Sequence, residues 1–167
     1  MTLTLILTRH AKSSWGDADL ADHDRPLNKR GHASAKAIGR WLADRGLVPD
    51  EVLCSGALRT RQTWTHIAET MVGDPAAQFT DALYLADADA MRNVLALAEG
   101  KTVMMVAHNP GSAYMARKLV AEAPEHEKFS HYPTGATAVI EFDADDWSEV
   151  QWKSGRVVEF VVPRELI

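Results

Sequence analysis

Four residues far apart in the sequence carry side chains that could act together on a phosphoryl group. Arg9 and His10 directly follow a short apolar run near the start of the chain. Arg59 lies in the first turn of a predicted helix, and His108 follows a second apolar run. Arginine guanidinium groups are permanently charged and bind phosphate oxygens in a forked geometry. A neutral imidazole can attack phosphorus while neighbouring cations stabilise the charge on the transferring group.

The position of Arg59 favours an anion between these cations. Because the start of a helix already carries partial positive charge, an arginine in its first turn is locally unfavourable. A bound phosphate removes that penalty and also accepts from the free N–H groups of the helix start. Each residue alone also has a structural explanation. His10 would cap a strand end, Arg59 would be a solvated helix charge, and His108 would fit a tight Asn-Pro-Gly turn.

These side chains meet only if the elements before them belong to one sheet. Apolar and β-branched runs predict strands at 3–8, 51–54, 103–107, 136–142, 148–153 and 156–162, with a short strand or turn at 79–85. Apolar spacing and capping signals predict helices at 28–45, 57–71, 88–98 and 112–120. The alternation predicts an α/β fold, a three-layer sandwich with a mostly parallel central sheet and helices on both faces. The last three strands predict an antiparallel edge.

The order of elements also predicts where the four side chains lie. In open α/β sheets, ligand sites lie beyond the carboxyl ends of the strands. Arg9 and His10 follow the first predicted strand. Arg59 follows the second, and His108 follows the strand at 103–107. If these three strands are parallel and close together, the four side chains converge at one end of the sheet.

Length and composition narrow the class of protein. The 167 residues predict one domain spanning 1–167. Hydrophobic residues make up 46% and charged residues 25%, which excludes disordered, collagen-like and coiled-coil chains. The net charge of −5 argues against broad nucleic-acid binding, although residues 1–61 hold ten Lys and Arg against seven Asp and Glu. No targeting or membrane segment is visible and there is one cysteine, so the expected location is cytoplasmic.

Four segments of the chain, in this order and spacing, resemble a known family. They are Thr8-Arg9-His10-Ala11-Lys12-Ser13, Arg25-Pro26-Leu27-Asn28-Lys29-Arg30-Gly31, Ser55-Gly56-Ala57-Leu58-Arg59-Thr60-Arg61-Gln62-Thr63 and Val106-Ala107-His108-Asn109-Pro110-Gly111. The family is the histidine phosphatase superfamily, whose members share a phosphoglycerate mutase-like fold. The short chain and the segment Pro133-Thr134-Gly135-Ala136 resemble its SixA-type phosphohistidine phosphatase branch. The resemblance extends from residue 3 to about residue 142.

The resemblance implies a role for each matched residue. His10 is the residue that becomes phosphorylated, and Arg9, Arg59 and His108 complete the phosphate pocket. Two further residues are implied to bind substrate: Arg25, a basic residue common in the small branch, and Asn109, through its backbone. The implied protein is a phosphatase that needs no metal and no cofactor. It dephosphorylates phosphohistidine on a protein, in a pocket whose open mouth suits a protein side chain.

Three departures from the family pattern affect these expectations. Ala11 stands where glycine is usual after the nucleophile, and Gly56 replaces a usual proline. Larger members carry an acidic proton donor in the segment that matches 82–85, and this chain has no carboxylate there. Nearby aspartates are Asp81, Asp87 and Asp89. An alcohol leaving group needs a general acid, whereas a phosphorylated imidazole can leave already protonated, so we expect a preference for phosphohistidine.

Alternatives remain open at this point. A small-molecule phosphomonoesterase of the same superfamily would act on a small phosphorylated metabolite, and a non-catalytic member would only bind phospho-ligands. Cys54 and Arg59 miss the Cys-x5-Arg spacing of cysteine phosphatases by one residue. The seven histidines form no H-E-x-x-H pair, so no metal site is predicted, and no phosphate-binding G-x-x-x-x-G-K loop occurs. We expect no nucleic-acid or membrane partner.

Overall fold

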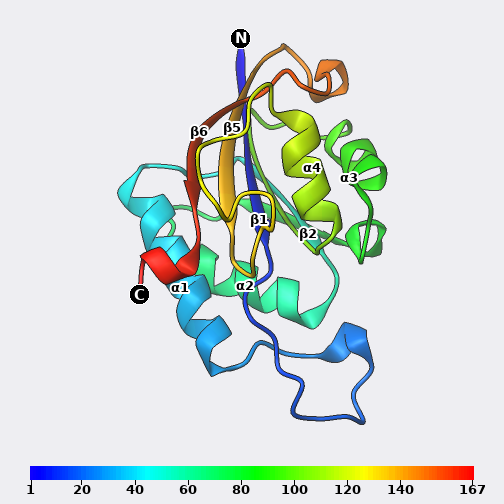
Figure 1. Cartoon of the computed structure of the whole chain (residues 1–167), viewed down its shortest axis with the longest axis vertical. Coiled ribbons are helices and arrows are strands. Elements are labelled where there is room, and N and C mark those ends of the chain that lie inside the picture. The colour runs from blue at the N-terminus through cyan, green and yellow to red at the C-terminus, as the bar shows by residue number, and fades with distance from the viewer.

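One six-stranded sheet runs through the computed structural model, which describes all of residues 1–167. The strands lie in the order β3-β2-β4-β1-β5-β6 (Figure 1). Their bounds are β1 (Thr2–Arg9), β2 (Glu51–Ser55), β3 (Ala76–Thr80), β4 (Thr102–Ala107), β5 (Thr137–Asp143) and β6 (Arg156–Val161). Strands β1 to β4 run parallel to one another, and β5, which pairs with β1, and β6 add an antiparallel edge. The predicted mostly parallel sheet is therefore confirmed.

The central strands are rich in buried apolar residues because both of their faces are covered. Leu5 and Leu7 of β1 pack into one core, and Ile6 packs into the core on the opposite face. All residues of β4 from Val103 to Ala107 are fully buried. A parallel strand covered on both sides reads as a continuous apolar run, which is the pattern that predicted it.

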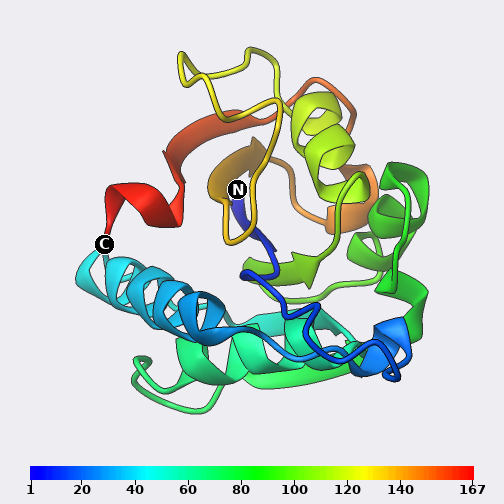
Figure 2. The same cartoon turned by 60° about the horizontal axis from the view of Figure 1, so that its bottom comes forward.

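Four helices cover the sheet in two pairs. Their bounds are α1 (Lys29–Asp44), α2 (Leu58–Ala68), α3 (Ala88–Leu95) and α4 (Gly111–Leu119). The first pair packs on the face that carries Ile6, and the second pair packs on the face that carries Leu5 and Leu7 (Figure 2). The predicted three-layer sandwich with helices on both faces is confirmed. The longest helix has 16 residues, and no helix has the apolar length that a membrane crossing needs.

The start of α1 is fixed against the segment that follows His10. The Asn28 side chain caps the helix by accepting from Gly31 N at 2.8 Å, as its residue type predicts. Asn28 N donates to Lys12 O at 3.0 Å, and a Cβ added at Gly31 would lie 2.0 Å from that same oxygen. Only glycine permits this approach, so α1 directly supports the loop that carries the nucleophile candidate.

One local prediction needs correction. The predicted strand at 148–153 is wrong, because this region forms a short 3₁₀ helix (Trp147–Glu149) followed by a turn. Trp147 is buried and its indole N–H donates to Gly100 O at 2.7 Å, while the Asp146 side chain caps Ser148 N. The antiparallel edge therefore has two strands, not three. The region at 79–85 contains the end of β3 and a 3₁₀ helix (Asp81–Leu83).

Candidate functional site

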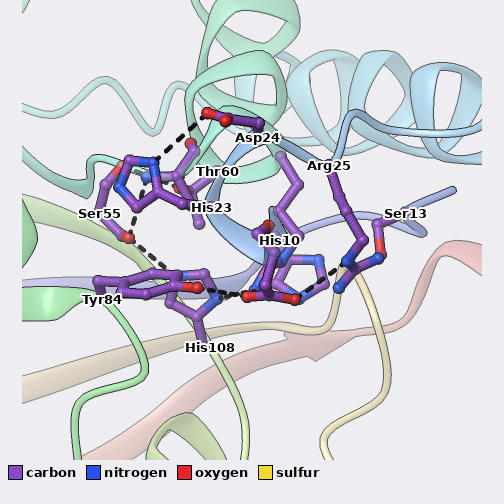
Figure 3. A network of polar contacts seen from close by, with 12 residues as sticks. His10, Ser13, His23, Asp24, Arg25, Ser55, Thr60, Tyr84 and His108 are labelled. Carbon is purple, nitrogen blue, oxygen red and sulfur yellow. Dashed lines mark hydrogen bonds and ion pairs between the residues drawn. The ribbon is translucent and has the colours of Figure 1, made fainter. Parts of the chain in front are cut away.

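The four sequence-predicted pocket residues lie together at one edge of the sheet. β2, β4 and β1 are parallel neighbours, so their carboxyl ends meet at this edge. The ring centroids of His10 and His108 are 5.4 Å apart. Arg59, the second residue of α2, places its Nη2 3.4 Å from His108 Nδ1. Figure 3 shows both imidazole rings within one network of polar contacts.

His10 is held as a neutral ring with one free nitrogen. Its Nδ1 lies 2.7 Å from Ala11 O, and because a carbonyl only accepts, Nδ1 carries the proton and Nε2 keeps its lone pair. Ala11 N in turn donates to Thr63 Oγ1 at 3.0 Å, which holds the backbone at Ala11 in place. Burial, with the charge of Arg9 adding to it, lowers the pKa of His10 to about 3. At neutral pH the ring is therefore an available nucleophile.

His108 is also neutral and has a defined tautomer. It is 1% exposed, and burial together with the Arg59 charge lowers its pKa to about 3. Since a guanidinium only donates, His108 Nδ1 accepts from Arg59. His108 Nε2 therefore carries the proton, which it donates to Ser55 Oγ at 2.8 Å. Ser55, the last residue of β2, is a functional contact that sequence reasoning did not identify.

Arg9 and Arg59 each have a buried donor that the protein leaves unused. The Nε atoms of Arg9 and Arg59 are both buried, and neither has a hydrogen-bond partner. Burial and the neighbouring Arg59 charge lower the pKa of Arg9 below its usual value. Buried donors without partners are rare and costly in folded proteins. Both guanidinium groups line the pocket, and an anion between them would reduce their mutual repulsion.

A carboxylate that the sequence analysis did not single out joins the site. Asp22 Oδ2 accepts from Arg59 Nη2 at 3.0 Å and from the hydroxyl of Tyr84. Asp22 Oδ1 accepts from Arg25 Nε at 3.0 Å, and Arg59 Nη1 donates to the Asp22 carbonyl at 2.7 Å. Although burial opposes it, these hydrogen bonds from Tyr84, Arg59 and Arg25 hold the pKa of Asp22 well below its usual range.

The aspartates near the expected position of a proton donor lie elsewhere. Asp81 Oδ1 is 2.9 Å from His23 Nε2, and Asp87 caps α3 by accepting from Ala90 N. Asp89 pairs with Lys118 at 3.6 Å. None of the three lines the pocket. In the amino-acid sequence, only its spacing of three residues before Arg25 distinguishes Asp22 from the three other aspartates of the loop.

The site opens into a pocket of about 600 Å³. It is lined by Arg9, His10, Lys12, Ser13, Ser14, Trp15, Asp22, Arg25, Asn28, Arg59, Leu85, His108, Asn109 and Thr134. Arg25 Nη1 donates to Ser13 Oγ at 2.7 Å, and its guanidinium stacks on the Trp15 ring with 3.6 Å to the ring centroid. Trp15 is 77% exposed, so it forms part of the pocket wall at the surface.

Asn109 lines the pocket, but its side chain holds the neighbouring loop. Its Nδ2 donates to the carbonyls of His131 and Tyr132, both at 3.0 Å, and its Oδ1 accepts from Ala113 N at 3.2 Å. The side chain is therefore structural. The expected backbone contact of Asn109 with a phosphate stays a prediction.

The chemistry of Cys54 differs from that of a phosphatase nucleophile. Cys54 is fully buried in the core between the sheet and α1 and α2. Burial raises the pKa of its thiol to about 12. Because the thiolate is the nucleophilic form, this side chain is unreactive at neutral pH. The structure also brings no three His, Cys, Asp or Glu side chains together as a metal site.

Asp22 occupies donors that an incoming anion would use, which leads to a prediction. Asp22→Asn is expected to bind inorganic phosphate roughly tenfold more tightly, because one negative charge a few ångströms away contributes more than ~1.4 kcal/mol at an effective dielectric constant of about 20. Titration calorimetry measures this affinity. Asp24→Asn, two residues along the loop and outside the pocket, is the matched control. Weaker phosphate binding by Asp22→Asn would instead assign Asp22 to orienting the arginines.

Sequence and structure comparisons find proteins that are similar to this chain. Residues 5–83 match the family model of the histidine phosphatase superfamily (branch 1). An uncharacterized protein of Mycobacterium leprae is 34% identical over 165 residues, covering 93% of this chain and 99% of its own. A candidate phosphohistidine phosphatase SixA from Nakamurella multipartitia is 29% identical with a TM-score of 0.80, covering 98% of this chain and 97% of its own. A similar candidate from Agrobacterium tumefaciens is 28% identical with a TM-score of 0.80, covering 96% and 98%.

Proposed function

Because the chain belongs to the histidine phosphatase superfamily, and within it to the SixA-type branch, we propose that it dephosphorylates phosphohistidine on a protein by way of a phosphorylated His10. The observation that carries this proposal is the neutral His10 ring in a pocket that the guanidinium donors of Arg9 and Arg59 also line. A phosphoryl group is the ligand that such a nucleophile and such donors would share.

The reaction has two steps. In the first, His10 Nε2 attacks phosphorus in line, the N–P bond to His10 forms, and the bond to the leaving group breaks. Arg9 and Arg59 bind the equatorial oxygens, on which charge is spread in the transition state. His108 accepts from Arg59 Nη2 through its Nδ1 and so helps to orient this guanidinium, and Arg25 holds the wall of the pocket through Ser13. In the second step water attacks the same phosphorus, and inorganic phosphate and neutral His10 are released.

The state of Asp22 supports phosphohistidine as the substrate. Asp22 is the one carboxylate that lines the pocket, and its lowered pKa keeps it ionised at neutral pH. It therefore has no proton to give to an alcohol leaving group, a contribution of about 10²–10⁴-fold in rate. A phosphorylated imidazole can leave as the neutral ring after taking its proton from solvent, so it loses little from the absence of an acid.

Two matched peptides test the proposed substrate. We expect kcat/KM for a phosphohistidine peptide to exceed that for the same peptide with phosphoserine by about 10² or more. Both rates are measured by phosphate release, with and without a chelator, and the chelator is expected to have no effect. A preference for phosphoserine would assign the protein to the phosphomonoesterases. Binding of both peptides without phosphate release would identify a non-catalytic phospho-ligand-binding protein.

A further inference from the structure

A second cavity lies beside the catalytic pocket and shares two of its lining residues, Lys12 and Thr134. Its volume is about 580 Å³. It is formed by the first turns of α1, the loop before Gly135 and the 3₁₀ helix near the C-terminus (Pro163–Glu165). In Figure 1 this last helix, in red, lies against α1. We call this cavity the basic groove.

The basic groove gathers cations that the protein itself does not neutralise. Lys12, Arg30, Lys128 and Arg164 line it and are all exposed. None of their side chains forms an ion pair or hydrogen bond within the protein, and no Asp or Glu lines the groove. In a chain with a net charge of −5, this concentration of positive charge creates a local field that attracts anions.

The acidic residues next to the groove in sequence do not line it. Glu165 follows Arg164, but its Oε1 lies 2.7 Å from His126 Nε2 and also accepts from Val162 N at 3.2 Å. Glu127 precedes Lys128 and does not line the groove. The four cations therefore face the cavity without a competing carboxylate.

Lys12 connects the basic groove to the catalytic pocket. It lies two residues after His10, and its carbonyl accepts from Asn28 N at 3.0 Å. The close approach of Gly31 to that same carbonyl fixes the Lys12 backbone against the start of α1. A substrate whose phosphoryl group lies at His10 therefore extends past a rigid Lys12 when it continues into the groove.

We propose, on the basis of the function proposed above, that the basic groove binds an acidic stretch of polypeptide next to the phosphorylated histidine of the substrate protein. Four separate cations match carboxylates spaced along an extended chain at about 3.3 Å per residue better than they match a single small anion. Apolar atoms of Pro133, Val162 and Pro163 line the groove between the charges and suit a peptide backbone with its side chains. The substrate class is then a phosphohistidine protein with a local acidic segment.

Peptide pairs and charge reversal test this surface. One phosphohistidine peptide carries Asp and Glu beside the histidine, and the other carries Asn and Gln. At low ionic strength we expect the acidic peptide to have a kcat/KM at least tenfold higher, and the double variant Lys128→Glu/Arg164→Glu to lose this preference. Turnover of phosphoramidate, which is too small to reach the groove, should change by less than twofold. High salt should reduce the preference in the parent protein.

The matched control is Lys36→Glu/Lys101→Glu, which makes the same charge change at two exposed residues outside the groove. It is expected to retain the preference. An equal kcat/KM for the two peptides in the parent protein, or an equal loss in both double variants, would overturn the proposal.

A binding measurement separates failure of the groove from failure of the proposed function. The unphosphorylated acidic peptide is titrated into His10→Ala protein and followed by fluorescence anisotropy, which requires no catalysis. We expect the His10→Ala protein to bind the acidic peptide. Adding Lys128→Glu/Arg164→Glu to this protein should weaken the affinity at least tenfold. If no phosphorylated substrate is turned over but this binding is present, the proposed function fails and the groove stands. Binding that is no stronger than that of the Asn and Gln peptide, or weaker than that of a single-stranded oligonucleotide, overturns the acidic-peptide proposal.

Discussion

Replacement of His10 by alanine is expected to reduce kcat/KM for phosphorylated substrates by about 10⁴-fold or more, the scale seen when a catalytic nucleophile is removed. The pocket offers no substitute. His108 directs its protonated Nε2 to Ser55, and the Cys54 thiol is buried and un-ionised. The reaction is followed by phosphate release, and the intermediate by acid-labile phosphate trapped on the protein during turnover.

His32→Ala is the matched control for this substitution. His32 lies on α1, and its Nδ1 is 2.7 Å from His66 Nε2. It does not line the pocket. We expect this variant to keep at least half of the parental activity and to incorporate phosphate normally. Equal acid-labile labelling of His10→Ala and the parent protein would show that the nucleophile is another residue.

Arg59→Ala is expected to lower kcat/KM by about 10²–10³-fold, as removal of one preorganised donor to the transition state does. Arg59 is buried and contacts both His108 Nδ1 and Asp22 Oδ2. Its loss removes a charge from the phosphoryl group and also frees the two groups that it orients. Because the charge of Arg59 contributes to the low pKa of His108, the pKa of His108 should rise in the variant, and NMR titration of the ring can measure this.

Two further variants show whether the forked geometry or the charge of Arg59 is responsible for its contribution to kcat/KM. Arg59→Lys keeps the charge but not the forked donor, so we expect it to remain at least tenfold below the parent. Arg61→Ala removes an exposed arginine on the same helix, whose guanidinium lies 4.6 Å from the centroid of the Phe79 ring. This control should change activity by less than twofold. Full activity of Arg59→Lys would mean that a positive charge alone is sufficient.

The residues at strand ends were predictable because the strand fixes their position. A continuous apolar run such as the one that ends at Ala107 identifies a central parallel strand, and the next residue then lies at the ligand edge of the sheet. This argument places His10 and His108 without any knowledge of loop conformation. Arg59 follows by the same reasoning, since α2 starts three residues after β2 ends.

Residues in long loops were not predictable in this way. Asp22 reaches the pocket because its loop folds back over α2, and the path of that loop depends on tertiary contacts such as those of Arg59 with the Asp22 backbone. Local sequence pattern also misassigned residues 148–153 as a strand. There the burial of Trp147 and the side-chain cap of Asp146 outweighed the strand pattern. The basic groove combines four separate segments of the chain, so no single stretch of sequence reveals it.

The partner of the nucleophilic ring is the peptide oxygen of Ala11, and this choice affects the lifetime of the covalent intermediate. An anionic partner would attract the positively charged N-phosphorylated imidazole and slow its breakdown. An uncharged amide oxygen gives much less of this attraction, so the ring remains a good leaving group and hydrolysis can keep pace with phosphoryl capture. Since the oxygen belongs to the main chain, substitution of a side chain does not remove it.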